Sequence, residues 1–286
     1  MSQEADVSVR LRDVLGSQLG ELRHEPTTKR VRAELGGATV VDSLRAVLVW
    51  EPRRVVPTYA VPVEDVDAEL VASSAPVPDE AGPRVGFALP DVTDLPVLDP
   101  RVPFAVRSTP GEPVDVRVPA VDRTVAGFLP GDPDLADYVI VDFDGFDRWP
   151  EEDDPIVGHP ADPFHRIDVR ASSRHVQVML DGQVLADTRR ARMLFETMLP
   201  PRYYLPMDDV RVGLKRSPTQ TYCAYKGLAS YWSVDGAGRA VEDLLWGYED
   251  PLQDASTLTG YVSFFDERTD LVIDGTPRAR PVTPWS

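Results

Sequence analysis

VRAELGGATVVDSLRAVLVWE, residues 31–51, recurs in altered form as VQVMLDGQVLADTRRARMLFE, residues 176–196. The two segments align at a constant offset, and the alignment continues to Tyr59 and Tyr204. The identical pairs are Val31 and Val176, Leu35 and Leu180, Gly37 and Gly182, Asp42 and Asp187, Arg45 and Arg190, Ala46 and Ala191, and Glu51 and Glu196. After one inserted residue, PVEDVDAEL from Pro62 matches PMDDVRVGL from Pro206. The sequence therefore predicts an internal repeat.

The end of each repeat matches as well, because DYVIVDFDGFD from Asp137 resembles GYVSFFDERTD from Gly260. We predict one copy over 29–157 and a second over 164–275, each within the usual size of a small domain. A linker at 158–163 separates them. An N-terminal helical segment, 1–28, precedes the copies, and a tail, 276–286, follows them.

Each copy opens with a hairpin signal, Gly36-Gly37 in the first and Asp181-Gly182 in the second, between alternating apolar runs. The segments RAVLVWE and RARMLFE predict a third strand, and residues 261–274 predict further strand. Leu11, Val14, Leu15 and Leu22 have helical spacing, with Asp6 or Ser8 as the cap. We also expect short helical turns at 64–71 and 241–247. The fold class is mainly β, or α+β with a strong antiparallel sheet: two tandem copies of a small, tent-like β domain plus the helix.

The composition excludes several classes of function. The net charge of -17, from 47 acidic and 30 basic residues, argues against nucleic-acid binding. No run of about 18 apolar residues could span a membrane, and the first residues lack the apolar core of a signal peptide. The single cysteine offers no zinc framework and no internal disulfide. We therefore expect an acidic cytoplasmic protein with no cofactor and no bound metal.

The candidate site is TYCAYKGLASYWSV, residues 221–234, which holds the only cysteine. Cys223 is either a nucleophile or a buried thiol that packs as a small apolar group. Lys226 either faces a ligand, to which it could bind by charge or as a Schiff base, or pairs with a buried acid such as Asp209 or Asp187. If this stretch is a continuous strand, Cys223 and Lys226 point to opposite faces and do not cooperate, whereas a bend at Gly227 would let them converge.

Four aromatic residues, Tyr204, Tyr225, Tyr231 and Trp232, could wall a pocket around these two residues or simply fill the core. Asp209 and Arg190 are further candidates for ligand binding. The alternative for Asp209 is a helix cap. The alternative for Arg190, which recurs with Asp187 in the first copy, is a structural role at the hairpin end.

Two weaker groups of candidate residues lie in the linker and just before it. HPADPFH, 159–165, places two histidines and an aspartate three residues apart, but its prolines exclude a helix, so a linker is the better interpretation than a metal site. WPEEDDP, 149–155, is a run of carboxylates, and such runs usually lie on a solvated surface.

Copy two carries DGxVLADT, RYYLPxDDV, YCAYKGLASYWSV, WGYEDP and GYVSFF in order. This series closely resembles the DUF427 family, a domain of unknown function that also carries a nucleotidyltransferase label. Its hallmark is C-P-[WY]-K-G-x-A-S-Y-[WY], and Ala224 stands where that hallmark has proline. Copy one departs further, because RSTPG from Arg107 replaces CAYKG. The resemblance implies a compact β-rich fold and no particular reaction, and the chain has no phosphate-loop motif to support nucleotidyl transfer.

Three hypotheses of function follow. In the first, copy two binds a small molecule or performs covalent or electrostatic catalysis on a carbonyl or acyl ligand at Cys223 and Lys226. In the second, the chain is a non-catalytic interaction module, and in the third it has the nucleotidyltransferase-like activity of the family label. A pocket shared by Cys223 and Lys226 would favour the first hypothesis. A fully buried thiol and a lysine paired with a carboxylate would favour the second.

Overall fold

Both predicted hairpins form in the computed structural model of the chain, which describes residues 8–74, 84–89, 92–98, 102–236, 239–283 and 285. Gly36 and Gly37 have φ of 58° and 84°, and Asp181 and Gly182 have φ of 50° and 81°. Positive φ at both turn residues is the geometry that a two-residue hairpin of this hand requires. Both hairpins also contain a bulge, between Ala33 and Glu34 and between Val178 and Met179.

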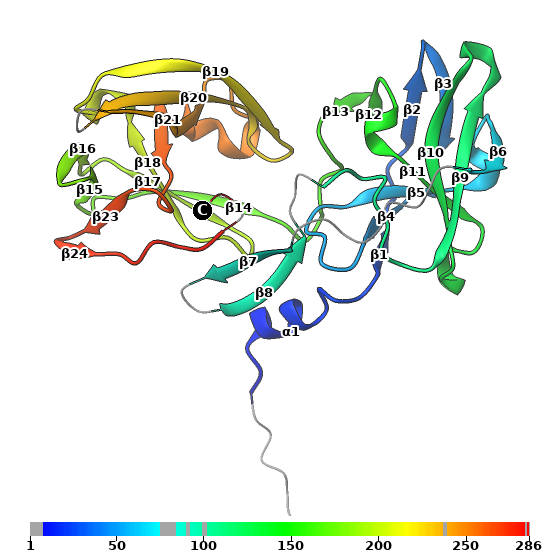
Figure 1. Cartoon of the computed structure of the whole chain (residues 1–286), viewed down its shortest axis with the longest axis horizontal. Coiled ribbons are helices and arrows are strands. Elements are labelled where there is room, and N and C mark those ends of the chain that lie inside the picture. The colour runs from blue at the N-terminus through cyan, green and yellow to red at the C-terminus, as the bar shows by residue number, and fades with distance from the viewer. Residues whose placement is uncertain are drawn as a thin grey trace, which may run out of the picture. The chain divides into compact units, whose positions relative to one another are not determined.

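The chain divides into two compact units. Unit 1 comprises Met1–Val85 and Asp94–Ile156, and unit 2 comprises Gly86–Thr93 and Val157–Ser286. Each unit contains one seven-stranded and one four-stranded antiparallel sheet (Figure 1). The fold is therefore mainly β with a small N-terminal helix, as the sequence predicts. No helix in the described part of the chain is long and apolar enough to cross a membrane.

In unit 1 the seven-stranded sheet has the order β1 (Arg23–Pro26), β4 (Val47–Trp50), β5 (Thr58–Pro62), β11 (Tyr138–Val141), β10 (Arg123–Pro130), β9 (Gly111–Val118) and β6 (Glu69–Ala72). The four-stranded sheet has the order β13 (Asp154–Ile156), β12 (Trp149–Glu151), β2 (Val31–Leu35) and β3 (Ala38–Ser43). A separate pair consists of β7 (Arg84–Leu89) and β8 (Val92–Leu98).

In unit 2 the seven-stranded sheet has the order β14 (Ile167–Ala171), β17 (Arg192–Glu196), β18 (Arg202–Pro206), β22 (Tyr261–Phe264), β21 (Arg239–Tyr248), β20 (Gly227–Gly236) and β19 (Leu214–Cys223). The four-stranded sheet has the order β16 (Gln183–Thr188), β15 (Val176–Leu180), β23 (Asp270–Ile273) and β24 (Thr276–Pro277). When the strands of each unit are counted in chain order, those of unit 2 have the same neighbours in their sheets as those of unit 1.

The helical elements are short. They are α1 (Leu11–Ser17) and the 3-10 turns Val63–Asp65, Pro119–Val121, Pro133–Leu135, Phe143–Gly145, Met207–Asp209 and Gln253–Leu258. The N-cap of α1 is Arg10, so Ser8 does not cap it, and Asp6 lies outside the described residues. Leu22 lies beyond the helix and packs against the core of unit 1, whereas Leu11 on the helix is exposed. The helical spacing therefore continues past the end of the helix.

Two other predicted elements differ from the structure. Residues 241–247, predicted as a helical turn, lie inside β21, because pairing with β20 and β22 on both sides outweighs their helical pattern. Of residues 64–71, only the beginning is helical, and β6 occupies the end. Residues 261–274 form two strands, β22 and β23, which belong to different sheets and are separated by a turn.

Each unit has an apolar layer on both faces of its large sheet. In unit 1, Leu48 and Trp50 join a cluster shared with the small sheet, whereas Val47 and Val49 face a separate cluster. This alternation is what a strand buried on both faces requires. In unit 2, Tyr203 and Leu205 join the cluster shared with the small sheet, and Tyr204 faces the other one.

The register corrects one predicted equivalence. Tyr59 lies opposite Leu48 and belongs to the cluster between the sheets, as Tyr203 does. Tyr204 faces the outer cluster and corresponds to Ala60. The one-residue length difference between the repeats therefore lies before Tyr59, in the connection that precedes β5, and not after it.

The segments at the predicted domain edges pack closely. Trp149, the first residue of the WPEEDDP run, is buried and stacks on Phe143, and Glu151 accepts hydrogen bonds from the Tyr59 hydroxyl and from Lys29. Within the segment predicted as a tail, Thr283 is buried and donates to Glu267. Neither segment consists only of solvated residues.

Candidate functional site

The stretch that holds Cys223 is a hairpin turn and not a continuous strand. β19 ends at Cys223, β20 begins at Gly227, and the Lys226 amide donates to the Cys223 carbonyl oxygen at 3.3 Å. Gly227 has φ of 95°, and a Cβ there would lie 3.4 Å from the Asp250 oxygen. A residue with a side chain would be strained at this position. The condition for placing Cys223 and Lys226 on opposite faces, a continuous strand, is therefore not met, because the strand ends between them.

Lys226 is buried and paired with a carboxylate. Its Nζ lies 2.6 Å from each carboxylate oxygen of Glu196, and the two side chains are 9% and 8% exposed. Burial lowers the pKa of Lys226, but the charge of Glu196 outweighs burial and raises this pKa above its ordinary value. The ammonium is therefore fixed in its protonated form, which opposes a Schiff-base role because that reaction needs a neutral amine.

Glu196 holds a second basic side chain. His165 Nε2 lies 3.1 Å from Oε1 of Glu196. Burial alone would raise the pKa of Glu196, but Lys226 and His165 together lower it to about 2. The predicted acidic partners of Lys226 were Asp209 and Asp187, so the partner itself was missed. A signal was available, since Glu196 is one of the residues that recur in both repeats.

The predicted linker forms one side of this cluster. The His165 ring stacks on Tyr225, with 4.4 Å between the ring centroids, and the Asp162 amide donates to the Tyr225 hydroxyl at 2.8 Å. The ring of His159 lies 6.1 Å from the same tyrosine, and burial lowers the pKa of His159. The two histidines therefore contact Tyr225 and Glu196. They do not form a metal-ligand set with Asp162 in the described structure.

The predicted aromatic wall does not converge on one space. Tyr204 is 1% exposed, and its hydroxyl accepts from Trp246 at 3.1 Å, so it is a core residue. Tyr231 packs in the same cluster as Cys223 and bonds to Thr221. Trp232 packs in the cluster on the opposite face of the sheet. Of the predicted residues, Tyr204, Tyr231 and the half-buried Cys223 share one cluster, and the charge of Cys223 acts on both Lys226 and Tyr225.

Arg190 and Asp209 lie elsewhere in unit 2, at the corner where the end of the β15–β16 hairpin meets the 3-10 turn Met207–Asp209. Arg190 binds Asp209 at 2.6 Å, and Asp209 also accepts a hydrogen bond from Thr188. Asp209 is therefore not the helix cap that its sequence suggested. Asp187, predicted to act with Arg190, instead accepts a hydrogen bond from His175 at 2.7 Å.

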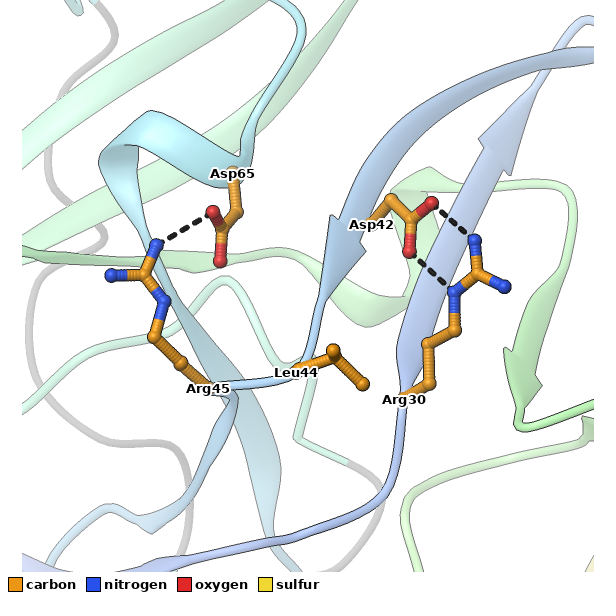
Figure 2. Close-up of a pocket in the computed structure, with 5 residues that line it drawn as sticks. All are labelled: Arg30, Asp42, Leu44, Arg45 and Asp65. Carbon is orange, nitrogen blue, oxygen red and sulfur yellow. Dashed lines mark hydrogen bonds and ion pairs between the residues drawn. The ribbon is translucent and has the colours of Figure 1, made fainter.

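Unit 1 has an equivalent corner, where the end of the β2–β3 hairpin meets the 3-10 turn Val63–Asp65. There Arg45 binds Asp65 at 2.7 Å (Figure 2). Asp65 also accepts a hydrogen bond from Ser43. Arg30 and Asp42 form a second closed pair beside it. Both units thus use an arginine, an aspartate and a hydroxyl to tie the end of the first hairpin to the turn after the fifth strand, which indicates a structural role for Arg190 and Asp209.

The counterpart of Glu196 in unit 1 is held differently. Glu51 is 1% exposed and accepts hydrogen bonds from the backbone and hydroxyl of Ser108 and from Thr109. Arg107 approaches it at 3.8 Å. These three residues begin the RSTPG segment that stands where unit 2 has CAYKG. The buried carboxylate is therefore common to both units, whereas the thiol, the lysine and the histidine belong to unit 2.

Within the described residues, one group of side chains has metal-ligand types in close proximity. It consists of His24, Asp132 and Asp134 in unit 1, whose ligand atoms lie within 4.8 Å of one another. Asp132 accepts a hydrogen bond from the Asp134 amide, and His24 lies 3.6 Å from the Asp134 carboxylate. A capping bond and a surface ion pair account for this group without a metal ion.

Two features define the class of this protein. One is a β-rich unit with a large and a small antiparallel sheet, and the other is a buried lysine–glutamate pair beneath a hairpin turn. The chain belongs to the family described as "Domain of unknown function (DUF427)", whose model carries the name NTP_transf_9 and matches residues 23–77 and 168–275. The match covers most of unit 2 and only the first part of unit 1. No curated protein matches the chain.

Proposed function

We propose that unit 2 carries a small-molecule site at the Cys223–Lys226 turn, with the first unit as a copy of the same module that lacks this site. The ligand would present a carbonyl or acyl group. Cys223 would be the reacting group, and Lys226 would act through its charge. The observations that carry this proposal are that a half-buried thiol and a buried ammonium bonded to Glu196 belong to one turn, and that the charges of Cys223 and Lys226 interact. The pairing of Lys226 with Glu196 meets one of the two conditions for an interaction module, and the half-buried thiol does not meet the other.

The chemistry follows from the charge of Lys226. The thiol first loses its proton to water, and the thiolate then attacks the carbonyl carbon, so that a carbon–sulfur bond forms and the carbonyl π electron pair moves onto the oxygen. When that electron pair returns, the bond to the leaving group breaks, and with p-nitrophenyl acetate the group that departs is p-nitrophenolate. A fixed positive charge stabilises such an oxygen without having to reorganise during the reaction. Glu196 holds the ammonium in place, and His165 completes the hydrogen bonding of Glu196. Lys226 is thus an electrostatic group and not the nucleophile.

The test is the position of a covalent adduct. The full chain would be treated with p-nitrophenyl acetate, and the acetylated residue would be located by peptide mass spectrometry. We expect the acetyl group on Cys223 in the wild type and no acetylation in this turn for Cys223→Ser. Acetylation of Lys226, or of neither residue while surface lysines react, would contradict the proposal.

A second candidate function, a non-catalytic interaction module, has its own support. Tyr222 and Leu228 are paired across the strands at the tip of the same hairpin and are 36% and 46% exposed. Leu252, beside Gly227, is exposed as well. β19 is also an edge strand, and edge strands can recruit an extended peptide. Under this alternative Tyr222→Lys would abolish a complex seen by light scattering, while Cys223→Ser would leave it intact.

A further inference from the structure

A shallow depression of about 450 Å³ in unit 2 is lined by three arginines and no acidic residue. Its lining residues are Ala171, Ser172, Ser173, Arg189, Arg190, Ala191, Arg192 and Tyr261. This concentration of positive charge occurs in a chain whose net charge is -17. The depression lies at the Arg190–Asp209 corner and does not include Cys223 or Lys226, so it is distinct from the site proposed above.

The three arginines differ in what they contact. Arg190 is neutralised by Asp209. Arg192 lies over the ring of Tyr261, 5.3 Å from its centroid, and its buried Nε has no hydrogen-bond partner in the described structure. Arg189 is exposed at the rim. The net positive charge of the depression therefore comes from Arg189 and Arg192.

A depression at the equivalent place in unit 1 shares two positions with this one, Leu44 with Arg189 and Arg45 with Arg190. It is lined by Arg30, Asp42, Leu44, Arg45 and Asp65. Figure 2 shows that its two arginines are each closed by an aspartate, with Leu44 between the two pairs. At the repeat offset, Leu44 corresponds to Arg189, and Val47 corresponds to Arg192. Unit 2 thus carries two additional guanidinium groups where unit 1 is apolar.

We infer that this depression of unit 2, formed at the start of β17 and the end of β14, binds the phosphate group of a small molecule. Guanidinium groups match phosphate oxygens in geometry and charge, and the hydroxyls of Ser172 and Ser173 supply further donors. The backbone that carries them is fixed, because the Ser172 amide donates to the Ala191 carbonyl at 2.8 Å. The volume lies within the range of ligand sites and is too small for a folded partner.

The test is calorimetric titration of the full chain with inorganic pyrophosphate and, in a second arm, with vesicles that contain phosphatidate. Arg189→Leu introduces the residue that unit 1 has at this position, and we expect it to weaken binding about tenfold. Arg45→Leu makes the same change in net charge at the unit 1 corner, and we expect the affinity to stay as in the wild type.

Loss of binding in Arg189→Leu in either arm supports the site, and the arm that responds identifies the source of the phosphate. The inference is overturned if the wild type binds neither probe at millimolar concentration, or if Arg45→Leu weakens binding as much as Arg189→Leu. Since Cys223 is untouched, acetylation of its thiol should be unchanged in Arg189→Leu. A failure here is therefore distinguishable from a failure of the proposed thiol site.

Discussion

Glu51 in unit 1 and Glu196 in unit 2 occupy equivalent positions but have different hydrogen-bond partners. Both are buried at the end of the strand that follows the first hairpin. Unit 1 satisfies Glu51 with neutral donors from Ser108 and Thr109, and Arg107 stays at 3.8 Å. Unit 2 satisfies Glu196 with the charged donor Lys226 at 2.6 Å and with His165. The two units thus bond a buried carboxylate at equivalent positions with different donors, neutral ones in unit 1 and a charged one in unit 2.

The largest expected effect is on the stability of unit 2. Lys226→Met leaves Glu196 buried without its main partner, so we expect a loss of about 3–5 kcal/mol. Arg107→Met should cost clearly less, because Glu51 retains its hydrogen bonds to Ser108 and Thr109. Hydrogen exchange, followed separately for peptides of the two units, measures both losses. Equal losses of stability in the two variants would contradict the difference between Glu51 and Glu196.

The second effect is on acid stability. The pKa of Glu196 is lowered from 4.5 to about 2, so its contribution is fully present above pH 4.5 and is lost as pH falls towards 2. We expect unit 2 to lose about 3 kcal/mol across this range. The double variant Lys226→Met/Glu196→Gln removes the charged pair and should flatten the profile. If its acid unfolding matches the wild type, another group is responsible.

A third difference lies two residues after the strand that ends with Val141 in unit 1 and Phe264 in unit 2. Unit 1 has Phe143 there, and unit 2 has the buried Asp266. Burial raises the pKa of Asp266 to about 7, although Arg202 opposes the shift. Its stabilising contribution is present below about pH 4 and is lost as pH rises through 7.

We therefore expect Asp266→Asn to stabilise unit 2 by up to about 4 kcal/mol at roughly pH 8 and to have little effect near pH 4. Thermal unfolding at the two pH values measures the difference. Destabilisation at the higher pH would mean that the attraction between Asp266 and Arg202 exceeds the cost of burying the charge.

The smallest effect should be the same in both units. Arg45 and Arg190 make equivalent exposed ion pairs with Asp65 and Asp209. Solvent screens exposed ion pairs, so Arg45→Ala and Arg190→Ala should each leave the urea midpoint nearly unchanged. Urea titration of the two variants checks it. A cost several times larger for Arg190 alone would indicate that its corner does more than tie the hairpin.

The scaffold could be predicted from sequence because its signals are local. The Gly36-Gly37 and Asp181-Gly182 turns specify hairpins by their φ requirement, and alternation along the flanking strands specifies the buried faces. The 241–247 segment could not be placed by its pattern, since two neighbouring strands determine its conformation.

The candidate site was less predictable because its contacts are distant in sequence. Glu196 lies 30 residues before Lys226, and His165 lies 31 residues before Glu196. Recurrence of Glu196 was visible, but a recurring residue reads as structural until its partners are known. Sequence left two relations between Cys223 and Lys226 open, and the end of β19 at Cys223, with positive φ at Gly227, selects the turn.

The central claim is that Lys226 assists Cys223 through its charge. The most direct measurement is the rate of Cys223 acetylation by p-nitrophenyl acetate in the wild type and in Lys226→Met/Glu196→Gln, in which no buried charge is left unpaired. We predict that the thiol reacts at least about tenfold more slowly in the double variant, as expected when one stabilising donor for the oxyanion is lost. Equal rates in two folded proteins would contradict the claim.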